Sequence, residues 1–244
     1  MSGSLGLSTT VLPTQPYFRI TSPSPTYYTG NPADYPNIVN GKGAFRSLIG
    51  GRYNYRATTT VYLTENVETC FAEKMFYFHR ETLRKLDALH ITGSLVPLFT
   101  QRFILWEIYF ANAVDDVFDM NIAGAASYFG IFPCMSLNPS QDYDHLRDKR
   151  GIIEVYGYKG LRVASSRAVN GGNMVVLFEG QSSNVRAIMP CTVEFRLVND
   201  AGTPFTNHAH EILDFTSGEV RITSGYVPHG AEPYQQWTKV NFNH

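Results

Sequence analysis

One segment constrains the fold more than any other, because a strand pattern there runs directly into a helix pattern. Residues 59–63 are β-branched and aromatic, as is typical of a short strand. The polar residues after them can begin a helix, and Thr64 or Asn66 is the expected N-cap. From Val67, apolar residues recur at spacings of three and four, which predicts an amphipathic helix ending near Arg84.

Further short patterns of both kinds follow in irregular order. Strands are expected at 17–20, at 103–118 as one or two strands, and at 173–178, with a small Ala- and Gly-rich helix at 121–129. Residues 187–198 alternate between apolar and polar, and 212–223 have the pattern of a hairpin turning at Thr216-Ser217-Gly218-Glu219. These patterns predict an α+β fold whose C-terminal third is antiparallel.

Length and charge limit the classes of protein to consider. A chain of 244 residues, 43% of them hydrophobic, is long enough for one well-buried core, so we expect a single domain over residues 1–244. The formal charge of -1 argues against nucleic-acid binding by this chain alone, since phosphate contacts need a surplus of Lys and Arg. A small neutral or anionic ligand fits this charge.

The sequence also indicates a compartment. Residues 1–15 lack the positive region and apolar core of a signal peptide, and no later run of about 18 residues is apolar enough to cross a bilayer. The three cysteines, Cys70, Cys134 and Cys191, have no CxxC spacing, which argues against a disulfide framework and a Cys-rich zinc site. We therefore expect a soluble protein of the reducing cytoplasm, with no membrane partner.

Several common site motifs are absent or incomplete. Gly41-Lys42-Gly43 resembles the start of a dinucleotide fingerprint, but the third glycine would fall at Arg46 and no βαβ pattern surrounds it. The sequence contains neither a GxxxxGK[ST] loop nor a GxSxG elbow. His208 and His210 could share one face of a strand beside Glu211, but a third metal ligand is not evident, so no metal is expected.

The informative residues surround the opening strand and helix. Gly50 and Gly51 let the backbone turn and approach a ligand before Arg52, whose planar guanidinium can hold a phosphate of a pyrophosphate through two parallel hydrogen bonds. Tyr62, at the strand end, can stack on a flat cationic heterocycle such as nicotinamide, and Glu73 supplies a carboxylate from the helix. Taken singly, each residue has a commoner structural or solvent-facing role. The ordered combination points to a site.

This combination resembles the RES-domain family. The family pattern has a strand with an arginine, here Tyr17-Phe18-Arg19-Ile20, followed by a GGRWN-like turn, a strand ending in Tyr and a helical Glu. Residues 160–167 resemble the family's Gly-Leu-x-Tyr-Pro-Ser-x-Arg segment, which places the family serine at Ser165, with Ser166 as the alternative. Asp119 is similar to the family's mid-domain Leu-Asp-Leu element.

The resemblance covers about residues 17–180, which we take as the core, and leaves 185–244 as a C-terminal antiparallel β extension. Tyr53 stands where the family usually has Trp, and Ala164 where it has Pro. The resemblance implies a fold similar to ADP-ribosyltransferases, with mixed, mainly antiparallel sheets and a few helices. It also implies that NAD is the substrate and that its nicotinamide–ribose bond is cleaved.

The family's chemistry implies a role for each residue. Glu73 would stabilise the oxocarbenium-like ribose left by nicotinamide. Arg52, assisted by Arg19, would hold the pyrophosphate, with Gly51 allowing close approach. Tyr62 would stack on nicotinamide or the adjacent ribose, and Ser165 would bind the nicotinamide amide or position the ribose.

The fate of the ADP-ribose unit stays open at this point, because its acceptor can be water, inorganic phosphate or a protein side chain. Many relatives are toxins restrained by an Xre-like antitoxin, so such a partner is expected here, and a homodimer also stays open. The alternatives to NAD degradation are an ADP-ribosyltransferase that modifies a protein target and a non-catalytic nucleotide-binding module.

Overall fold

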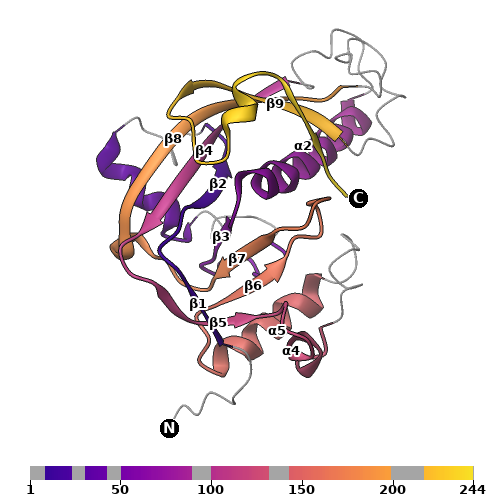
Figure 1. Ribbon diagram of the computed structural model, residues 1–244. Coiled ribbons are helices and arrows are strands. Elements are labelled where there is room, and N and C mark those ends of the chain that lie inside the picture. Colours follow the sequence, from indigo (N-terminus) through magenta and orange to yellow (C-terminus); the bar gives the residue numbers. More distant parts are fainter. Residues whose placement is uncertain are drawn as a thin grey trace.

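Ten strands form one twisted sheet in the computed structural model of the chain, which describes residues 9–23, 31–42, 51–89, 100–131, 143–198 and 217–243 (Figure 1). The strands are β1 (Thr9–Leu12), β2 (Tyr17–Thr21), β3 (Val61–Thr64), β4 (Thr100–Phe110), β5 (Val114–Asp119), β6 (Gly160–Ala164), β7 (Asn173–Leu177), β8 (Val185–Arg196), β9 (Ser217–Gly225) and β10 (Thr238–Asn241). The helices are α2 (Val67–Leu89), α4 (Ala125–Tyr128), α5 (Tyr143–Val155) and the short 3₁₀ helices η1 (Pro32–Val39), η3 (Ser182–Asn184) and η5 (Glu232–Gln235).

The sheet order is β1-β5-β6-β7-β3-β2-β4-β8-β9-β10, and its centre is made by strands from the N-terminal third of the chain. All neighbouring strands are antiparallel except β5 and β6, which are parallel. This mixed, mostly antiparallel sheet with a few helices confirms the predicted α+β class. The region predicted as one or two strands at 103–118 forms two, β4 and β5.

Helix α2 follows β3 as the sequence predicts. Asn66 caps it, because its Oδ1 accepts a hydrogen bond of 2.7 Å from the backbone N–H of Thr69. The helix continues to Leu89, beyond the predicted end near Arg84. Its apolar stripe packs on one face of the sheet, where Phe71 contacts Phe195 of β8 edge to face. Burial of this stripe fixes the helix relative to the central strands.

Three apolar clusters hold the layers together. The first lies between α2 and the strands β4, β8, β9 and β10, and the second lies on the opposite face of the central strands beside η1. The third joins β5, β6 and β7 to α4 and α5, and it includes Tyr53 from the predicted GGRYN turn. The turn is thus anchored in the core by its aromatic residue.

The hairpin predicted at Thr216–Glu219 is wrong. Ser217, Gly218 and Glu219 lie within one continuous strand, β9, and pair with β10. A Cβ on Gly218 would lie 2.5 Å from the Sδ of Met75, so the glycine brings β9 close to α2 instead of turning the chain. The predicted antiparallel pairing of this region is confirmed by β8, β9 and β10.

Two other elements differ from expectation. The helix predicted at 121–129 is shorter, with only Ala125–Tyr128 helical after a turn. Helix α5 was not predicted, because its sequence is rich in charge and carries Gly151 in its interior.

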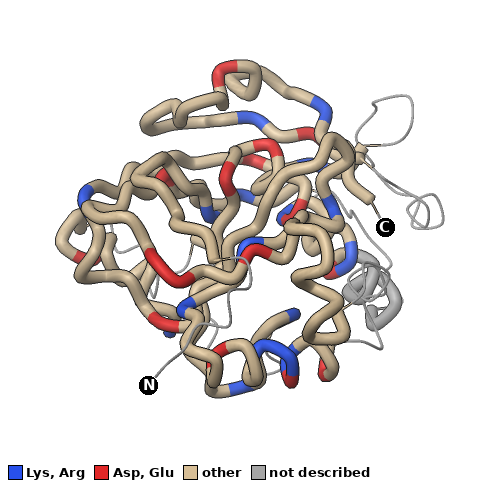
Figure 2. Tube along the Cα trace, turned by 60° about the horizontal axis from the view of Figure 1, so that its bottom comes forward, with Lys and Arg blue, Asp and Glu red and all other residues tan. Residues whose placement is uncertain are grey.

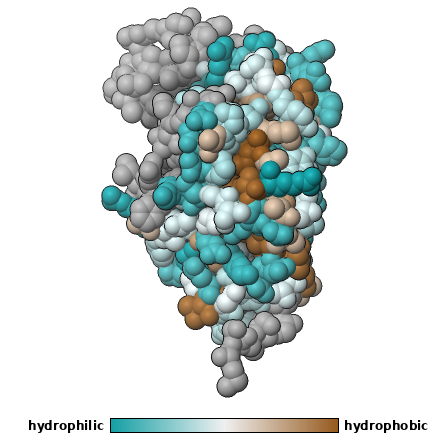
Figure 3. All heavy atoms as spheres, turned by 90° about the vertical axis from the view of Figure 1, so that its left-hand side faces the viewer, coloured by the Kyte–Doolittle hydropathy of each residue, from teal (hydrophilic) through white to brown (hydrophobic). Residues whose placement is uncertain are grey.

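In the part of the chain that the structure describes, no helix combines the length and apolar character that a membrane crossing requires. One side of the molecule shows a narrow strip of apolar residues bordered by polar ones (Figure 3).

Candidate active site

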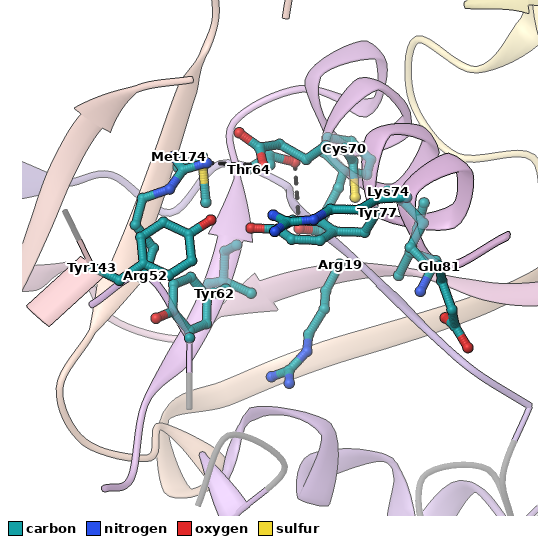
Figure 4. A pocket seen from close by; sticks show the side chains of 16 residues that line it. Arg19, Arg52, Tyr62, Thr64, Cys70, Lys74, Tyr77, Glu81, Tyr143 and Met174 are labelled. Atoms are coloured by element: carbon teal, nitrogen blue, oxygen red, sulfur yellow. Dashed lines mark hydrogen bonds and ion pairs between the residues drawn. The ribbon is translucent and has the colours of Figure 1, made fainter. Parts of the chain in front are cut away.

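A cavity of about 810 Å³ lies where β2, β3 and the turn at Gly51 meet the side of α2. Arg19, Gly51, Arg52, Tyr62 and Glu73 all line it, so the structure brings together five of the six residues expected at the site (Figure 4). The sixth, Ser165, lies behind Glu73 rather than in the described lining. The strand–helix unit recognised in the sequence therefore builds one wall of a single cavity.

The GGRYN segment forms a tight turn, of which Gly51 to Asn54 are described. The N–H of Gly51 donates to the carbonyl of Asn54 at 3.0 Å, leaving Arg52 and Tyr53 at the tip. A Cβ on Gly51 would lie 2.6 Å from Asn54 Oδ1 and 2.7 Å from the Tyr62 hydroxyl. The side chains of Asn54 and Tyr62 therefore leave room only for glycine at this position. From α5, Arg147 Nε donates to the Gly51 carbonyl at 2.8 Å and holds the turn in place.

The hydroxyl of Tyr62 is fully engaged by this turn. It donates to Asn54 Oδ1 at 2.7 Å and accepts from the N–H of Tyr53 at 2.9 Å. Burial raises the pKa of Tyr62 above its ordinary value, and the hydrogen bond from Tyr53 offsets this only in part. The hydroxyl thus stays protonated and fixed, and the ring of Tyr62 is what remains to contact a ligand in the cavity.

Tyr62→Phe is expected to lower the free energy of unfolding by about 1–3 kcal/mol, because Asn54 and the Tyr53 N–H lose their partner. Urea unfolding measures the change. Tyr128→Phe is the matched control, since Tyr128 lies exposed on α4 and should leave stability unchanged. Equal stability of the two variants would contradict the fixed hydroxyl.

Arg52 and Glu73 form the charged centre of the site. Arg52 Nη2 lies 3.9 Å from Glu73 Oε2, and both side chains are buried. Among the described residues, the three guanidinium nitrogens of Arg52 have no hydrogen-bond partner. Oε2 of Glu73 has none either. Burial, the largest single effect, would lower the pKa of Arg52, but Glu73 and the neighbouring tyrosines Tyr77, Tyr53 and Tyr143 together outweigh it and raise the pKa. Buried polar groups without partners are what a ligand site leaves open.

Ser165 fixes the other oxygen of Glu73. Its hydroxyl donates to Glu73 Oε1 at 2.7 Å and accepts from the backbone N–H groups of Arg167 and Ala168, both at 3.1 Å. With both acceptor positions occupied, its only proton points at Glu73. Ser166, the alternative to Ser165, is also buried, but its hydroxyl has no hydrogen-bond partner among the described residues.

Two other expected residues have structural contacts. Arg19 lines the cavity, but its Nη1 donates to the carbonyl of Ile38 at 2.6 Å. Asp119 lies at the end of β5 and accepts from Arg162, which also makes a two-point ion pair with Glu65 at the β3–α2 junction. This network ties β5 and β6 to the start of α2.

The sequence analysis missed Lys74, Tyr77, Arg80 and Tyr143, which also line the cavity. Helical spacing was the available signal for two of them, because Tyr77 and Arg80 follow Glu73 at i+4 and i+7. Tyr143 comes from the start of α5, and no local pattern connects it with Arg52. Figure 4 shows Tyr143 and Tyr77 pointing toward each other across the cavity.

Nucleophilic and metal-ligating groups are sparse in the described part. Cys70 lines the cavity, but burial raises the pKa of its thiol to about 12, so it is not a thiolate nucleophile near neutral pH. The described residues contain no group of three His, Cys, Asp or Glu side chains placed to hold a metal ion. His208, His210, Glu211 and Cys134 lie outside the described residues.

The sequence model of the RES domain matches residues 17–198, which is most of the chain. The chain belongs to the RES domain family. At family level, a RES domain is a toxin-like domain that acts on NAD, and the family is generally enzymatic. A search of curated proteins found no match to the chain.

The RES domain match ends before β9 and β10, yet the residues just after β10 contact the loop that follows Ser165. Ala168 forms a bridge with Phe242, and the N–H of Asn243 donates to the carbonyl of Arg167 at 2.9 Å. Phe242 is buried and packs against Phe76 of α2. The segment after the matched region thus supports the loop whose N–H groups hold Ser165.

Proposed function

We propose that this RES domain consumes NAD by cleaving its nicotinamide–ribose bond. The observation that carries the proposal is the arrangement of Glu73, whose oxygens face Ser165 on one side and Arg52 on the other beside the cavity. A carboxylate fixed at Oε1 by Ser165, with Oε2 left without a hydrogen bond, is pre-organised to meet a positive charge without moving. That is what cleavage of a cationic glycosyl bond requires.

The chemistry follows from the bond that breaks. When nicotinamide leaves, it takes the electron pair of the C–N bond and becomes neutral, while the positive charge passes to the ribose as an oxocarbenium ion. Because Ser165 directs its proton to Oε1, that oxygen of Glu73 acts as an acceptor. Glu73 then stabilises the developing ribose cation. The acceptor that completes the reaction is water or inorganic phosphate.

The ring of Tyr62 supports binding of the leaving group. Its hydroxyl is held by the GGRYN turn, so the ring is fixed at the cavity wall. A cationic pyridinium is attracted to the face of a tyrosine ring by about 0.5–2 kcal/mol, and the neutral product is not. Tyr62 therefore favours binding of NAD and release of nicotinamide.

The charge of the cavity matches NAD. Arg19, Arg52, Lys74 and Arg80 line it against two carboxylates, Glu73 and Glu81, which leaves two positive charges in excess. The diphosphate of NAD carries two negative charges. Elsewhere along the described trace, basic and acidic positions are interspersed (Figure 2).

We further propose that the protein is a cytoplasmic toxin held inactive by an Xre-like antitoxin, as the family relationship suggests. No metal takes part in this proposal. The alternative of ADP-ribose transfer to a protein uses the same cavity and is distinguished by the product.

Incubating purified protein with NAD is expected to release nicotinamide, measured by chromatography, in the presence of EDTA. Running the reaction with and without inorganic phosphate identifies the acceptor by mass, since water yields ADP-ribose and phosphate yields ADP-ribose 1″-phosphate. Labelled NAD added to a cell lysate tests the alternative, because transfer would mark a protein band. No nicotinamide release under any of these conditions would refute NAD cleavage.

A further inference from the structure

Helix α2 presents a polar row along the cavity that extends well beyond Glu73. Glu73, Tyr77 and Arg80 lie on one face of the helix at i, i+4 and i+7, and all three line the cavity. The helical rise separates Glu73 from Arg80 by about 10 Å along the axis. Arg80 is therefore set away from the reacting ribose by about the length of a sugar-phosphate unit.

Arg80 and Lys74 are the cavity cations that make neither a hydrogen bond nor an ion pair among the described residues. Among the described residues, Arg80 has no hydrogen-bond or ion-pair partner, and the ammonium of Lys74 lies over the ring of Phe103 at 4.3 Å without a carboxylate at ion-pair distance. Burial lowers the pKa of Lys74, and the charge of Glu81 offsets this only in part. An incoming anion would compensate both cations.

The other two cavity cations are less accessible to a diphosphate. Arg52 lies at the reacting end, 3.9 Å from Glu73, and its three nitrogens are buried, although they have no hydrogen-bond partner among the described residues. Arg19 donates to the carbonyl of Ile38. A diphosphate entering the cavity therefore meets its most available partners on α2.

We propose that Arg80, together with Lys74, binds the diphosphate of the dinucleotide and so selects NAD over nicotinamide riboside, which has the same scissile bond but no phosphate. This assignment rests on the proposed function. It divides the cavity into a reacting end at Glu73, Arg52 and Tyr62 and a phosphate end further along α2.

The kinetic test compares the two substrates. Arg80→Gln and Lys74→Gln are each expected to raise KM for NAD by about 10- to 100-fold with little change in kcat, because each removes a charge-assisted contact. Cleavage of nicotinamide riboside should keep its wild-type kcat/KM. Arg80→Lys, which retains the charge, should recover part of the affinity. Arg186→Gln on the exposed part of β8 is the control for net charge and should behave as wild type.

A binding test separates this proposal from the proposed function. Titration calorimetry with ADP-ribose measures the phosphate end without turnover, and both Gln variants should bind it about 10- to 100-fold more weakly than wild type. If nicotinamide is never released but this weakening is seen, the subsite stands and NAD cleavage falls. Unchanged ADP-ribose binding, or an equal loss of kcat/KM with nicotinamide riboside, would overturn the subsite.

Discussion

Glu73→Gln is expected to lower kcat for nicotinamide release by about 10²–10³-fold while leaving KM for NAD close to wild type. Glutamine has the same shape and still accepts the hydrogen bond from Ser165, but it carries no charge to stabilise the ribose cation. The loss should therefore appear in kcat. Steady-state kinetics measure both constants, and circular dichroism confirms that the variant is folded.

The matched control is Glu68→Gln, in the first turn of the same helix and outside the cavity lining. It should retain wild-type kcat. A Glu73→Gln enzyme with kcat within threefold of wild type would remove Glu73 from the reaction. Expression in cells adds a second readout, because a growth defect that survives Glu73→Gln unchanged would favour the non-catalytic nucleotide-binding module.

Gly51→Ala is the second change with a large expected effect. A single methyl group there would lie 2.6 Å from Asn54 Oδ1 and 2.7 Å from the Tyr62 hydroxyl, closer than atoms in a folded protein tolerate. Because the Tyr62 hydroxyl donates a hydrogen bond to Asn54 Oδ1, the clash must displace the Tyr62 ring or open the turn that carries Arg52. We expect the free energy of unfolding to fall by about 1–3 kcal/mol and kcat/KM for NAD to fall by about 10²-fold.

Gly151→Ala provides a control of opposite sign. Gly151 lies inside α5, where a Cβ would meet nothing within 4 Å, so alanine should stabilise the protein by about 0.5–1 kcal/mol and leave kcat/KM unchanged. Urea unfolding and NAD kinetics on both variants complete the comparison. If Gly51→Ala matched Gly151→Ala in stability and activity, the turn would not be set by the packing of Asn54 and Tyr62.

The sequence was sufficient to predict those elements whose structure is decided by residues that are close together along the chain. The strand predicted at 59–63 forms at Val61–Thr64, and the helix begins at Val67 as predicted. Arg52, Tyr62 and Glu73 lie in the same short stretch of sequence, and the structure places them around one cavity. The turn predicted at Thr216–Glu219 is wrong because Gly218 is needed for close packing against Met75, which lies far away in the sequence. Composition alone does not distinguish a glycine that turns the chain from one that admits a helix.

Roles that depend on distant segments were harder to predict. Ser165 was expected to contact the substrate, but its hydroxyl is directed at Glu73 and held by the loop that follows it. Tyr143 enters the cavity from α5, a helix that the sequence analysis did not expect. Kinetics of Ser165→Ala, with Ser166→Ala as the neighbouring control, distinguish a contact with the substrate from an action through Glu73.

The pairing of Phe242 and Asn243 with the loop after Ser165 has a consequence for synthesis of the protein. A ribosome adds about 5–20 residues per second, and N-terminal parts of a chain fold first. The strand–helix unit with Arg52, Tyr62 and Glu73 emerges early, but its supporting loop cannot gain all its contacts until residue 243 has been made. A nascent chain therefore carries an incompletely supported site until translation has passed this point.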